Sequence, residues 1–231
     1  MLDLDKMCSM GKVITMKKRL ARYIKPIKGR HYRWKIPLLK NTNMIHCESR
    51  LERDFVRLLD FDRNVIEVES QPVELLYSYK GRVRKYFPDF KVTTNDGQVR
   101  IVEVKPKSKT QKPENIIKFI IGKQFCEMHG WEYHIVTEEQ IFHGFIQENL
   151  DKLRALGQEL TDYNDLVIVL NTLQNTGLSS LEKLASNCNE MDEATFYKCI
   201  YKLIYHQKVY VNLLSEELNN QTIVSVQYGE E

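Results

Sequence analysis

The stretch RKYFPDFKVTTNDGQVRIVEVKPK, residues 84–107, has the pattern of a β-hairpin, with two apolar arms joined by an NDG loop. Gly97 at the end of that loop supplies the left-handed residue that three-residue hairpin loops need. Each arm nevertheless contains a carboxylate, Asp89 in the first and Glu103 in the second, and Lys105 follows two residues later. Charges are costly inside a protein unless they have partners, so this hairpin predicts a functional site.

The loop also fixes which residues face each other. With the loop centred on Asp96, Asp89 and Glu103 lie opposite each other, with Cβ atoms about 4.5–5.5 Å apart. Two carboxylates at that separation could share one divalent cation, Mg²⁺ or Mn²⁺. Alternation places Lys105 on the same face as Glu103. The residues expected to point into the core are Phe90, Val92, Val102 and Val104. The alternative is that the two acids form an edge-strand pair facing solvent.

A third metal ligand is expected from a helix. Residues 47–61 have helical spacing, with an apolar stripe of Leu51, Phe55, Leu58 and Leu59. Glu52 lies on or beside this stripe, and a glutamate there is costly without a partner. Glu52 is therefore the candidate, and Glu48, one turn earlier, is the reserve. Alternatively, Glu52 is an ordinary surface acid that pairs with Arg53 or Arg57.

Three carboxylates around Mg²⁺, followed by a lysine, suit the hydrolysis of a phosphodiester. The metal lowers the pKa of a bound water and neutralises charge that builds on the phosphate. Lys105 would orient that water or stabilise the transition state electrostatically. Lys107 and Lys109, just beyond, are candidates for holding the backbone of the substrate.

The order of the predicted elements indicates an α/β fold. Strands are expected over residues 65–69, 73–79, 86–93, 99–105 and 131–136, with a helix over 114–129 before the last strand. This order favours a mixed sheet flanked by helices. Beyond residue 143, helices over 145–156, 162–174, 180–187 and 192–206 precede a hairpin over 209–213 and 222–227, the outline of a winged helix. We therefore expect a basic arm (1–46), an α/β domain that carries the predicted site (47–142) and a winged-helix-like domain (143–231).

The charge of the chain is unevenly distributed. The net charge is +3, but residues 6–47 contain twelve Lys or Arg and no Asp or Glu. Such a segment would attract a phosphate backbone, and a solvated flexible segment is the alternative. The DNA-binding candidates within it are Lys17, Lys18, Arg19, Arg22, Arg30 and Arg33.

The last part of the chain is acidic. Residues 151–231 hold six basic and twelve acidic side chains, a net charge of −6. The predicted helix over 192–206 has only Lys198 and Lys202 as basic residues, and phosphate repulsion would oppose its entry into a DNA groove. We therefore expect this domain to bind a protein. Tyr197, Tyr201 and Tyr205 form a possible contact stripe, or they pack the core of the domain.

Composition excludes several other classes of protein. The five cysteines include no CxxC pair, which favours reduced thiols and a cytoplasmic location over a disulfide framework or a zinc site. No apolar run approaches the ~18 residues of a membrane span, and residues 1–13 lack the apolar stretch of a signal peptide. We expect no membrane partner.

Pro88-Asp89, followed a hairpin's length later by Glu103-Val104-Lys105, resembles the PD-(D/E)xK nuclease signature. The segments ESRLERDF, VESQP, YFPDF, VEVKPKSK and WEYHIVTEEQI extend the resemblance to TnsA-like endonucleases, which are subunits of heteromeric transposases. Some relatives carry Gln at the position of Glu103, so this chain is nearer the general nuclease pattern.

The resemblance spans roughly residues 34–140 and implies a restriction-enzyme-like fold with Mg²⁺-dependent cleavage of double-stranded DNA at transposon ends. The residues that fall on the family's catalytic positions are Glu52, Asp89, Glu103 and Lys105. Gln71 also resembles a recurrent family position, although an ordinary hydrogen-bonding loop residue is the simpler interpretation. The resemblance further implies that this subunit cuts the 5′ strand, that a DDE transposase subunit cuts and joins the 3′ strand, and that an ATPase regulator controls both.

Two other interpretations remain open. A nuclease of a restriction, repair or phage DNA-processing system could share the same core. A non-enzymatic assembly module could keep the fold, although the intact acidic set speaks against it.

Overall fold

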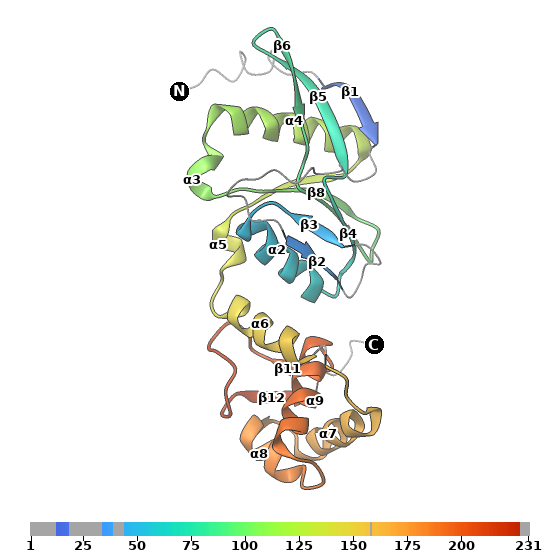
Figure 1. Ribbon diagram of the computed structural model, residues 1–231, viewed down its shortest axis with the longest axis vertical. Helices are drawn as coiled ribbons and strands as arrows, with labels where there is room; N and C mark the ends of the chain where they lie inside the picture. The colour runs from blue at the N-terminus through green and yellow to red at the C-terminus, as the bar shows by residue number, and fades with distance from the viewer. Residues whose placement is uncertain (1–12, 19–33, 39–43, 158, 227–231) are drawn as a thin grey trace. The chain divides into compact units, whose positions relative to one another are not determined.

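The computed structural model describes residues 13–18, 34–38, 44–157 and 159–226. The chain divides into two compact units, Met1–Ile141 and Phe142–Glu231, which we call the N-terminal and C-terminal units (Figure 1). The boundary expected between residues 142 and 143 lies next to this division. None of the helices within the described ranges is both long and apolar enough to span a membrane.

A four-stranded mixed sheet forms the centre of the N-terminal unit. Its strands are β4 (Val65–Ser70), β7 (Phe90–Thr94), β8 (Val99–Val104) and β9 (Glu132–Val136), in the order β4-β7-β8-β9. The first three pair antiparallel, whereas β9 pairs parallel to β8. A parallel partner needs a crossover connection, which here contains α4 (Pro113–His129). The predicted mixed sheet with flanking helices is therefore confirmed.

The hairpin of β7 and β8 has the predicted register. Phe90 pairs with Val102 and Thr93 pairs with Val99. Gly97 closes the loop with φ of +80°, and its N–H donates to the carbonyl of Thr94 at 2.9 Å. Extending the register by one residue beyond β7 places Asp89 opposite Glu103, as the sequence predicts.

The two faces of the four-stranded sheet are covered by different elements. One face packs against α2 (Arg50–Phe61), where the ring centroids of Phe55 and Phe90 are 6.0 Å apart. The residues predicted to face the core are all buried on this side: Phe90, Val92, Val102 and Val104. The opposite face packs against α4 and β5 (Val73–Tyr79), in a core that includes Ile101 and Ile121. Figure 1 shows α2 and α4 on opposite sides of the sheet.

The single strand predicted over residues 86–93 is wrong. The chain leaves a second sheet at the end of β6 (Arg82–Tyr86) before it enters β7. Pro88 lies in the break, and proline has no N–H to donate to a sheet ladder. The second sheet has the order β1-β5-β6, with antiparallel pairing throughout. β1 is Val13–Lys18, so a part of the predicted basic arm is an edge strand of the N-terminal unit.

Short elements complete the N-terminal unit. β2 (Trp34–Ile36) pairs antiparallel with β3 (Ile45–Cys47), just before α2. α3 (Lys107–Thr110) precedes α4, and Gly130 ends α4 in the left-handed conformation with φ of +67°. α5 (Glu138–Ile141) follows β9.

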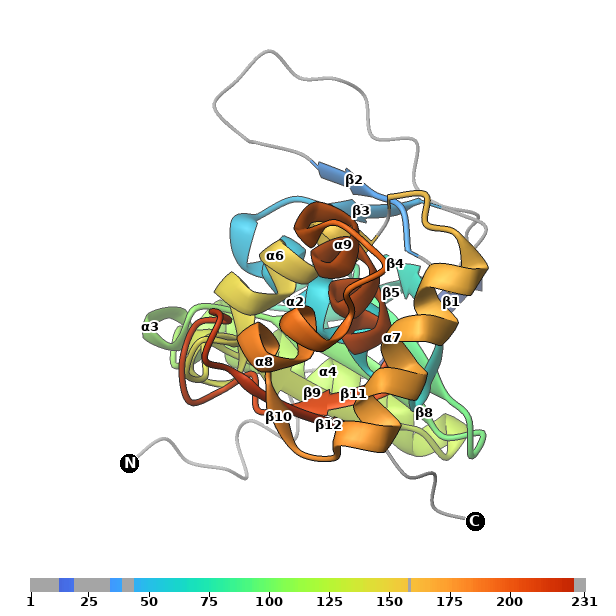
Figure 2. The same ribbon diagram turned by 90° about the horizontal axis from the view of Figure 1, so that it is seen from below.

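The C-terminal unit is mostly helical and contains a small sheet. Its helices are α6 (Ile146–Gly157), α7 (Tyr163–Thr176), α8 (Leu181–Asn187) and α9 (Glu193–Tyr205). Its strands are β10 (Ser179–Ser180), β11 (Val209–Val211) and β12 (Ile223–Val226), in the order β10-β12-β11. β11 and β12 run side by side in Figure 2. The side chains of Asp162, Ser180 and Asp192 cap the first turns of α7, α8 and α9, as their residue types favour.

Candidate active site

Asp89 lies between β6 and β7, where the ladder between β7 and β8 ends. Its Oδ2 accepts a hydrogen bond from the N–H of Val104 at 2.8 Å, and its backbone carbonyl accepts one from the N–H of Gln71 at 2.8 Å. Both bonds fix the carboxylate at the end of the hairpin. Among the described residues, no donor binds the other carboxylate oxygen, Oδ1.

Glu103 is held from two sides. Its side chain is 3% exposed, and its Oε1 lies 2.8 Å from Nζ of Lys105. Tyr86, which is 2% exposed, donates its hydroxyl hydrogen to Oε2 of Glu103 at 2.9 Å. The hydroxyl of Tyr133 lies 2.8 Å from that of Tyr86. A buried network of two tyrosines and one lysine therefore orients this carboxylate, and nothing in the hairpin sequence indicated the tyrosine from β9.

Glu52 lies in the first turn of α2 and helps to cap this helix together with Ser49. The N–H of Glu52 donates to Oγ of Ser49 at 3.2 Å, and that hydroxyl donates to Oε1 of Glu52 at 2.7 Å. Oε2 of Glu52 accepts the N–H of Glu48 at 2.7 Å. In this conformation the carboxylate of Glu52 stabilises the start of the helix.

The charged groups are close enough to perturb one another. Burial and the nearby carboxylates of Glu103 and Glu52 raise the pKa of Asp89 well above its usual range. Lys105 and a backbone N–H oppose this shift without cancelling it. Burial also raises the pKa of Glu52, although two local hydrogen bonds lower it. Burial alone would lower the pKa of Lys105, but the three carboxylates together raise it above its ordinary value.

The donor set suits a hard divalent cation, but it is incomplete. Asp89 and Glu103 offer carboxylate oxygens, which Mg²⁺ prefers, and Oδ1 of Asp89 is open to a further partner. Across the described ranges, however, no three His, Cys, Asp or Glu side chains are grouped closely enough to form a metal site. Glu52 is near enough to raise the pKa of Asp89, but both of its carboxylate oxygens are held by Glu48 and Ser49 at the start of α2. Asp89 and Glu103 therefore fit a cation, and Glu52 does not complete the site in this conformation.

Comparison with known families bears directly on this arrangement. Residues 62–138 match the family model described as TnsA-like endonuclease N terminal. This segment is similar to TnsA-like endonuclease domains. It contains Asp89, Glu103 and Lys105, whereas Glu52 lies before its start. The match points to a transposition-associated DNA endonuclease. No curated protein matches the chain.

Gln71, in the segment that matches the TnsA-like family, contacts two acidic residues at the candidate site. Besides its backbone bond to Asp89, its Nε2 donates to Oε1 of Glu48 at 3.3 Å. Its φ is +48°, a left-handed conformation that is uncommon for a residue other than glycine. Its Oε1 is buried, and no donor among the described residues binds it. The glutamine before Pro72 was the feature of the sequence that could have indicated this contact with the site.

The predicted DNA-binding residues differ in their exposure and in their contacts. Lys107 is exposed, and its ammonium pairs with Glu139 of α5. Lys109 is exposed on α3. The backbone of Lys17 pairs with that of Glu74 on β5, and Lys18 ends β1. The remaining candidates, Arg19, Arg22, Arg30 and Arg33, lie outside the described residues.

The predicted tyrosine stripe of α9 is largely internal to the C-terminal unit. Tyr201 and Tyr205 are buried in its core, because the apolar side of α9 packs against α6 and α7. Tyr197 is half-buried, and its hydroxyl donates to Oδ1 of Asn220 at 2.8 Å. Tyr201 and Tyr205 therefore fit the alternative that they pack the core of the domain, and a partner-binding role of the stripe stays a prediction.

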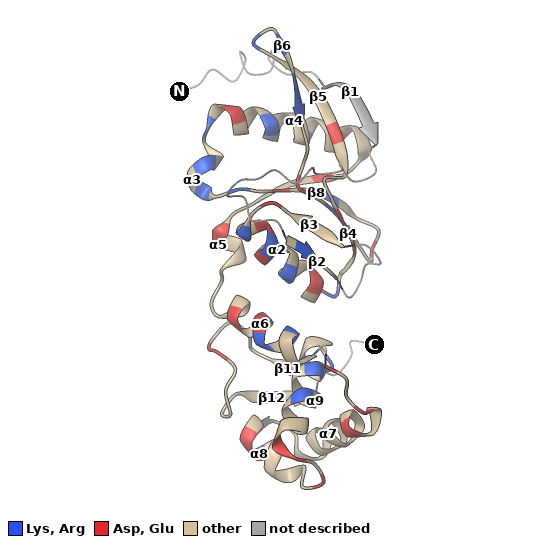
Figure 3. Ribbon diagram, in the orientation of Figure 1, with Lys and Arg blue, Asp and Glu red and all other residues tan. Residues whose placement is uncertain are grey.

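The two basic residues of α9 are engaged within the C-terminal unit. Nζ of Lys198 lies 2.7 Å from Oε2 of Glu159, and Nζ of Lys202 donates to the carbonyl of Glu159 at 2.9 Å. They are the only basic residues of α9, and the ribbon of this helix is mostly tan in Figure 3. The helix thus offers little positive charge to a phosphate backbone.

Proposed function

We propose that the protein is a Mg²⁺- or Mn²⁺-dependent DNA endonuclease subunit of a transposase, which cleaves the 5′ strand at transposon ends. One observation supports this above the others. Within the segment that matches the TnsA-like family, the register of the β7–β8 hairpin, continued by one residue, brings Asp89 opposite Glu103. The ammonium group of Lys105 pairs with the carboxylate of Glu103.

We assign a separate role in cleavage to each residue of this site. Asp89 and Glu103 would hold the divalent cation, and Glu52 would join them once its capping bonds open. When bound, the cation lowers the pKa of a water molecule and neutralises charge on the phosphate. Lys105 stays protonated at neutral pH because the surrounding carboxylates raise its pKa. It therefore donates to a phosphate oxygen or to the water as a cation, and it does not serve as a general base.

Tyr86 would act as a positioning residue. Its hydroxyl holds Oε2 of Glu103, which leaves Oε1 toward Lys105. Catalysis depends on charged groups that are fixed before the reaction begins, and the buried tyrosine pair meets that need. The pair also limits the access of water to this side of the carboxylate.

The finer assignments of fold and partners belong to the same proposal. A mixed sheet with α2 and α4 on opposite faces suits a restriction-endonuclease-like core. Helices α7, α8 and α9 with the strands β10, β11 and β12 suit a winged helix. The weak positive charge of α9 supports a protein-binding role for this unit, with a DDE transposase subunit or an ATPase regulator as the partner, while duplex DNA is the substrate of the N-terminal unit.

Reconstituted excision with the partner subunits tests the proposal. We expect Asp89→Asn to abolish 5′-strand cuts while 3′-strand cuts by the partner persist. Glu132→Gln makes the same chemical change at an exposed carboxylate of the neighbouring strand β9, and it should leave both cuts intact. Persistence of 5′ cuts in Asp89→Asn would remove this residue from the mechanism. Efficient cleavage of arbitrary duplexes without partner proteins would favour a restriction, repair or phage nuclease.

A further inference from the structure

The hairpin of β5 and β6 projects from the N-terminal unit and is strongly cationic. Lys80 and Gly81 turn the chain with φ of +49° and +69°, the left-handed pair typical of two-residue hairpin loops. Figure 1 shows the tip extending beyond the neighbouring strand β1 and helix α4. From residue 75 to residue 86 the hairpin contains four Lys or Arg and no Asp or Glu. Figure 3 shows the resulting blue tip and blue strand.

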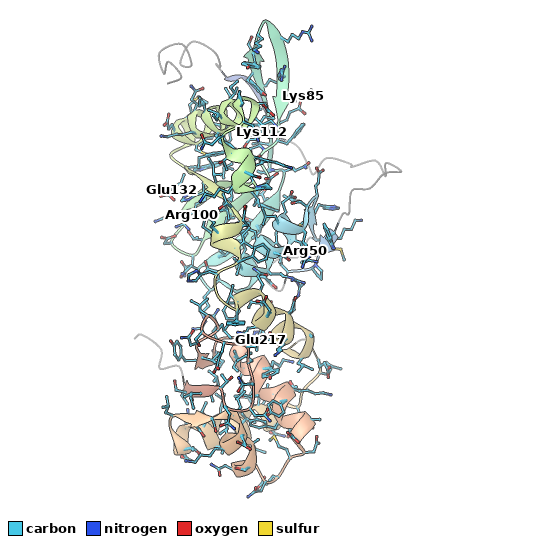
Figure 4. The ribbon with its side chains drawn as sticks, turned by 90° about the vertical axis from the view of Figure 1, so that its left-hand side faces the viewer. Arg50, Lys85, Arg100, Lys112, Glu132 and Glu217 are labelled. Carbon is cyan, nitrogen blue, oxygen red and sulfur yellow. The ribbon has the colours of Figure 1, made fainter. Side chains whose placement is uncertain are left out.

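Most of these charges lack an acidic partner. Lys85, labelled in Figure 4, pairs with the buried Glu74 at 2.6 Å. In the described part of the chain, no carboxylate pairs with Lys80, Arg82 or Arg84, although all three are exposed. The hairpin therefore keeps positive charge available for an external anion.

The arginines lie on a defined face. In the register of the hairpin, Arg82 pairs with Tyr79, and Tyr86 pairs with Leu75. Alternation places Arg82, Arg84 and Tyr86 on the same side of β6. The guanidinium of Arg84 lies 5.0 Å from the centroid of the Tyr79 ring, and Nζ of Lys80 lies 5.3 Å from it. A half-buried aromatic ring thus supports two cations at the tip.

This row of arginines ends at the candidate active site. Tyr86, the last member, is the residue that donates to Glu103. With a rise of about 3.3 Å per residue, Arg84 lies about 7 Å and Arg82 about 13 Å along the strand from Tyr86. A polyanion that contacts both arginines would therefore run along the strand toward the end of β6, beside the candidate active site.

We propose that the Arg82–Arg84 face of this hairpin binds the phosphate backbone of duplex DNA and guides it to the cleavage site. The inference rests on the proposed endonuclease function, and it adds binding residues other than those predicted in segment 6–47 and other than Lys107 and Lys109. DNA suits the surface because its backbone carries one negative charge per ~1.7 Å of helix axis. Arginine also recognises phosphate through two parallel hydrogen bonds, and a two-stranded ribbon fits the major groove.

The test is the binding of the full chain to a labelled DNA duplex, measured by fluorescence anisotropy without divalent cations over a series of salt concentrations. We expect the double variant Arg82→Gln/Arg84→Gln to bind about tenfold more weakly and to lower the salt slope by about 2, one for each lost phosphate contact. Arg82→Lys/Arg84→Lys keeps the charge and should retain most of the binding. Lys183→Gln/Lys208→Gln makes the same change of net charge at exposed positions of the C-terminal unit and should bind as wild type does.

Equal affinity and equal salt slope in wild type and Arg82→Gln/Arg84→Gln overturn the inference, as does failure of the wild-type chain to bind the duplex at low salt. The proposed function fails by a different result, namely 5′ cleavage that survives Asp89→Asn. An arginine variant that binds normally beside an inactive Asp89→Asn therefore refutes the hairpin alone. Weak binding by the arginine variant together with cleavage by Asp89→Asn refutes the catalytic assignment alone.

Discussion

Gly122 in α4 offers a test of the packing that supports Glu103. A Cβ atom built on Gly122 would lie 2.2 Å from Cε2 of the Tyr133 ring and 2.8 Å from its Cδ2 and Cζ. The hydroxyl of that ring lies 2.8 Å from the hydroxyl of Tyr86, which in turn donates to Glu103. Gly122→Ala is therefore expected to push Tyr133 aside and to loosen the support of the carboxylate.

The expected magnitude follows from three opposing contributions. Alanine inside a helix is more favourable than glycine by about 1 kcal/mol. Overpacking in a core costs about 1–3 kcal/mol, and loss of the hydrogen bond between the tyrosines costs about 1 kcal/mol. The net expectation is that Gly122→Ala destabilises the N-terminal unit by about 2 kcal/mol, which corresponds to a fall in Tm of about 4–8 °C.

The same substitution in a Tyr133→Val background tests whether the Tyr133 ring causes the loss of stability. Tyr133→Val removes the ring atoms that would clash and keeps a residue type that suits β9. In this background Gly122→Ala should be stabilising by about 1 kcal/mol, because only the helix propensity remains. The sign of the effect would thus invert, with a coupling energy of about 3 kcal/mol in the double-mutant cycle.

Urea unfolding followed by tryptophan fluorescence is a suitable assay, because both tryptophans, Trp34 and Trp131, belong to the N-terminal unit. The stability of each variant comes from the midpoint and slope of its transition. Equal destabilisation by Gly122→Ala in both backgrounds would refute the idea that the Tyr133 ring requires glycine here.

Three further predictions concern single side chains. Burial and nearby carboxylates raise the pKa of Asp89 in the folded protein. Protonated Asp89 therefore stabilises the fold. This stabilisation is complete below the pKa of about 3.9 in the unfolded chain, and it is lost as the pH rises through the higher pKa of the folded state. Thermal melts of the metal-free protein should therefore show less loss of stability with rising pH in Asp89→Asn, and an unchanged pH profile would contradict this. Tyr86→Phe should cost about 1.5–3 kcal/mol by urea unfolding, because it removes a donor to a charged group, and it should slow cleavage; a neutral effect on both would show that Glu103 needs no such support. Asn149→Leu should destabilise the C-terminal unit by about 3 kcal/mol, because its amide makes three hydrogen bonds to segment 213–218, two of them buried, and hydrogen exchange confined to this unit would measure the loss; unchanged exchange there would contradict it.

Local chemistry explains which parts of the site were predictable. The NDG loop sets the register of β7 and β8, because a three-residue loop with a left-handed Gly97 leaves one way to pair the arms. β5 also has the predicted bounds Val73–Tyr79. These features depend on residues that are neighbours in the sequence.

Long-range features were not predictable in the same way. The contact between Tyr86 and Tyr133 joins residues from two sheets, and neither residue lies in a pattern that indicates the other. The break before Asp89 was missed because an apolar run across Pro88 has the periodicity of one strand. The position of Glu52 was uncertain for a similar reason: helical spacing shows which side of α2 it occupies, but it does not show which face of the sheet that helix covers.

The fold keeps the mutually repelling carboxylates of the candidate site close together. Asp89 is kept near Glu103 and Glu52 although each raises its pKa, so the arrangement costs stability in the absence of a cation. The backbone N–H of Val104 and the left-handed Gln71 hold Asp89 in place despite this cost. Strain of this kind is typical of functional sites, where the surrounding fold maintains it. A divalent cation between the carboxylates would offset the repulsion, whereas a purely structural hairpin would gain by replacing Asp89 with a neutral residue.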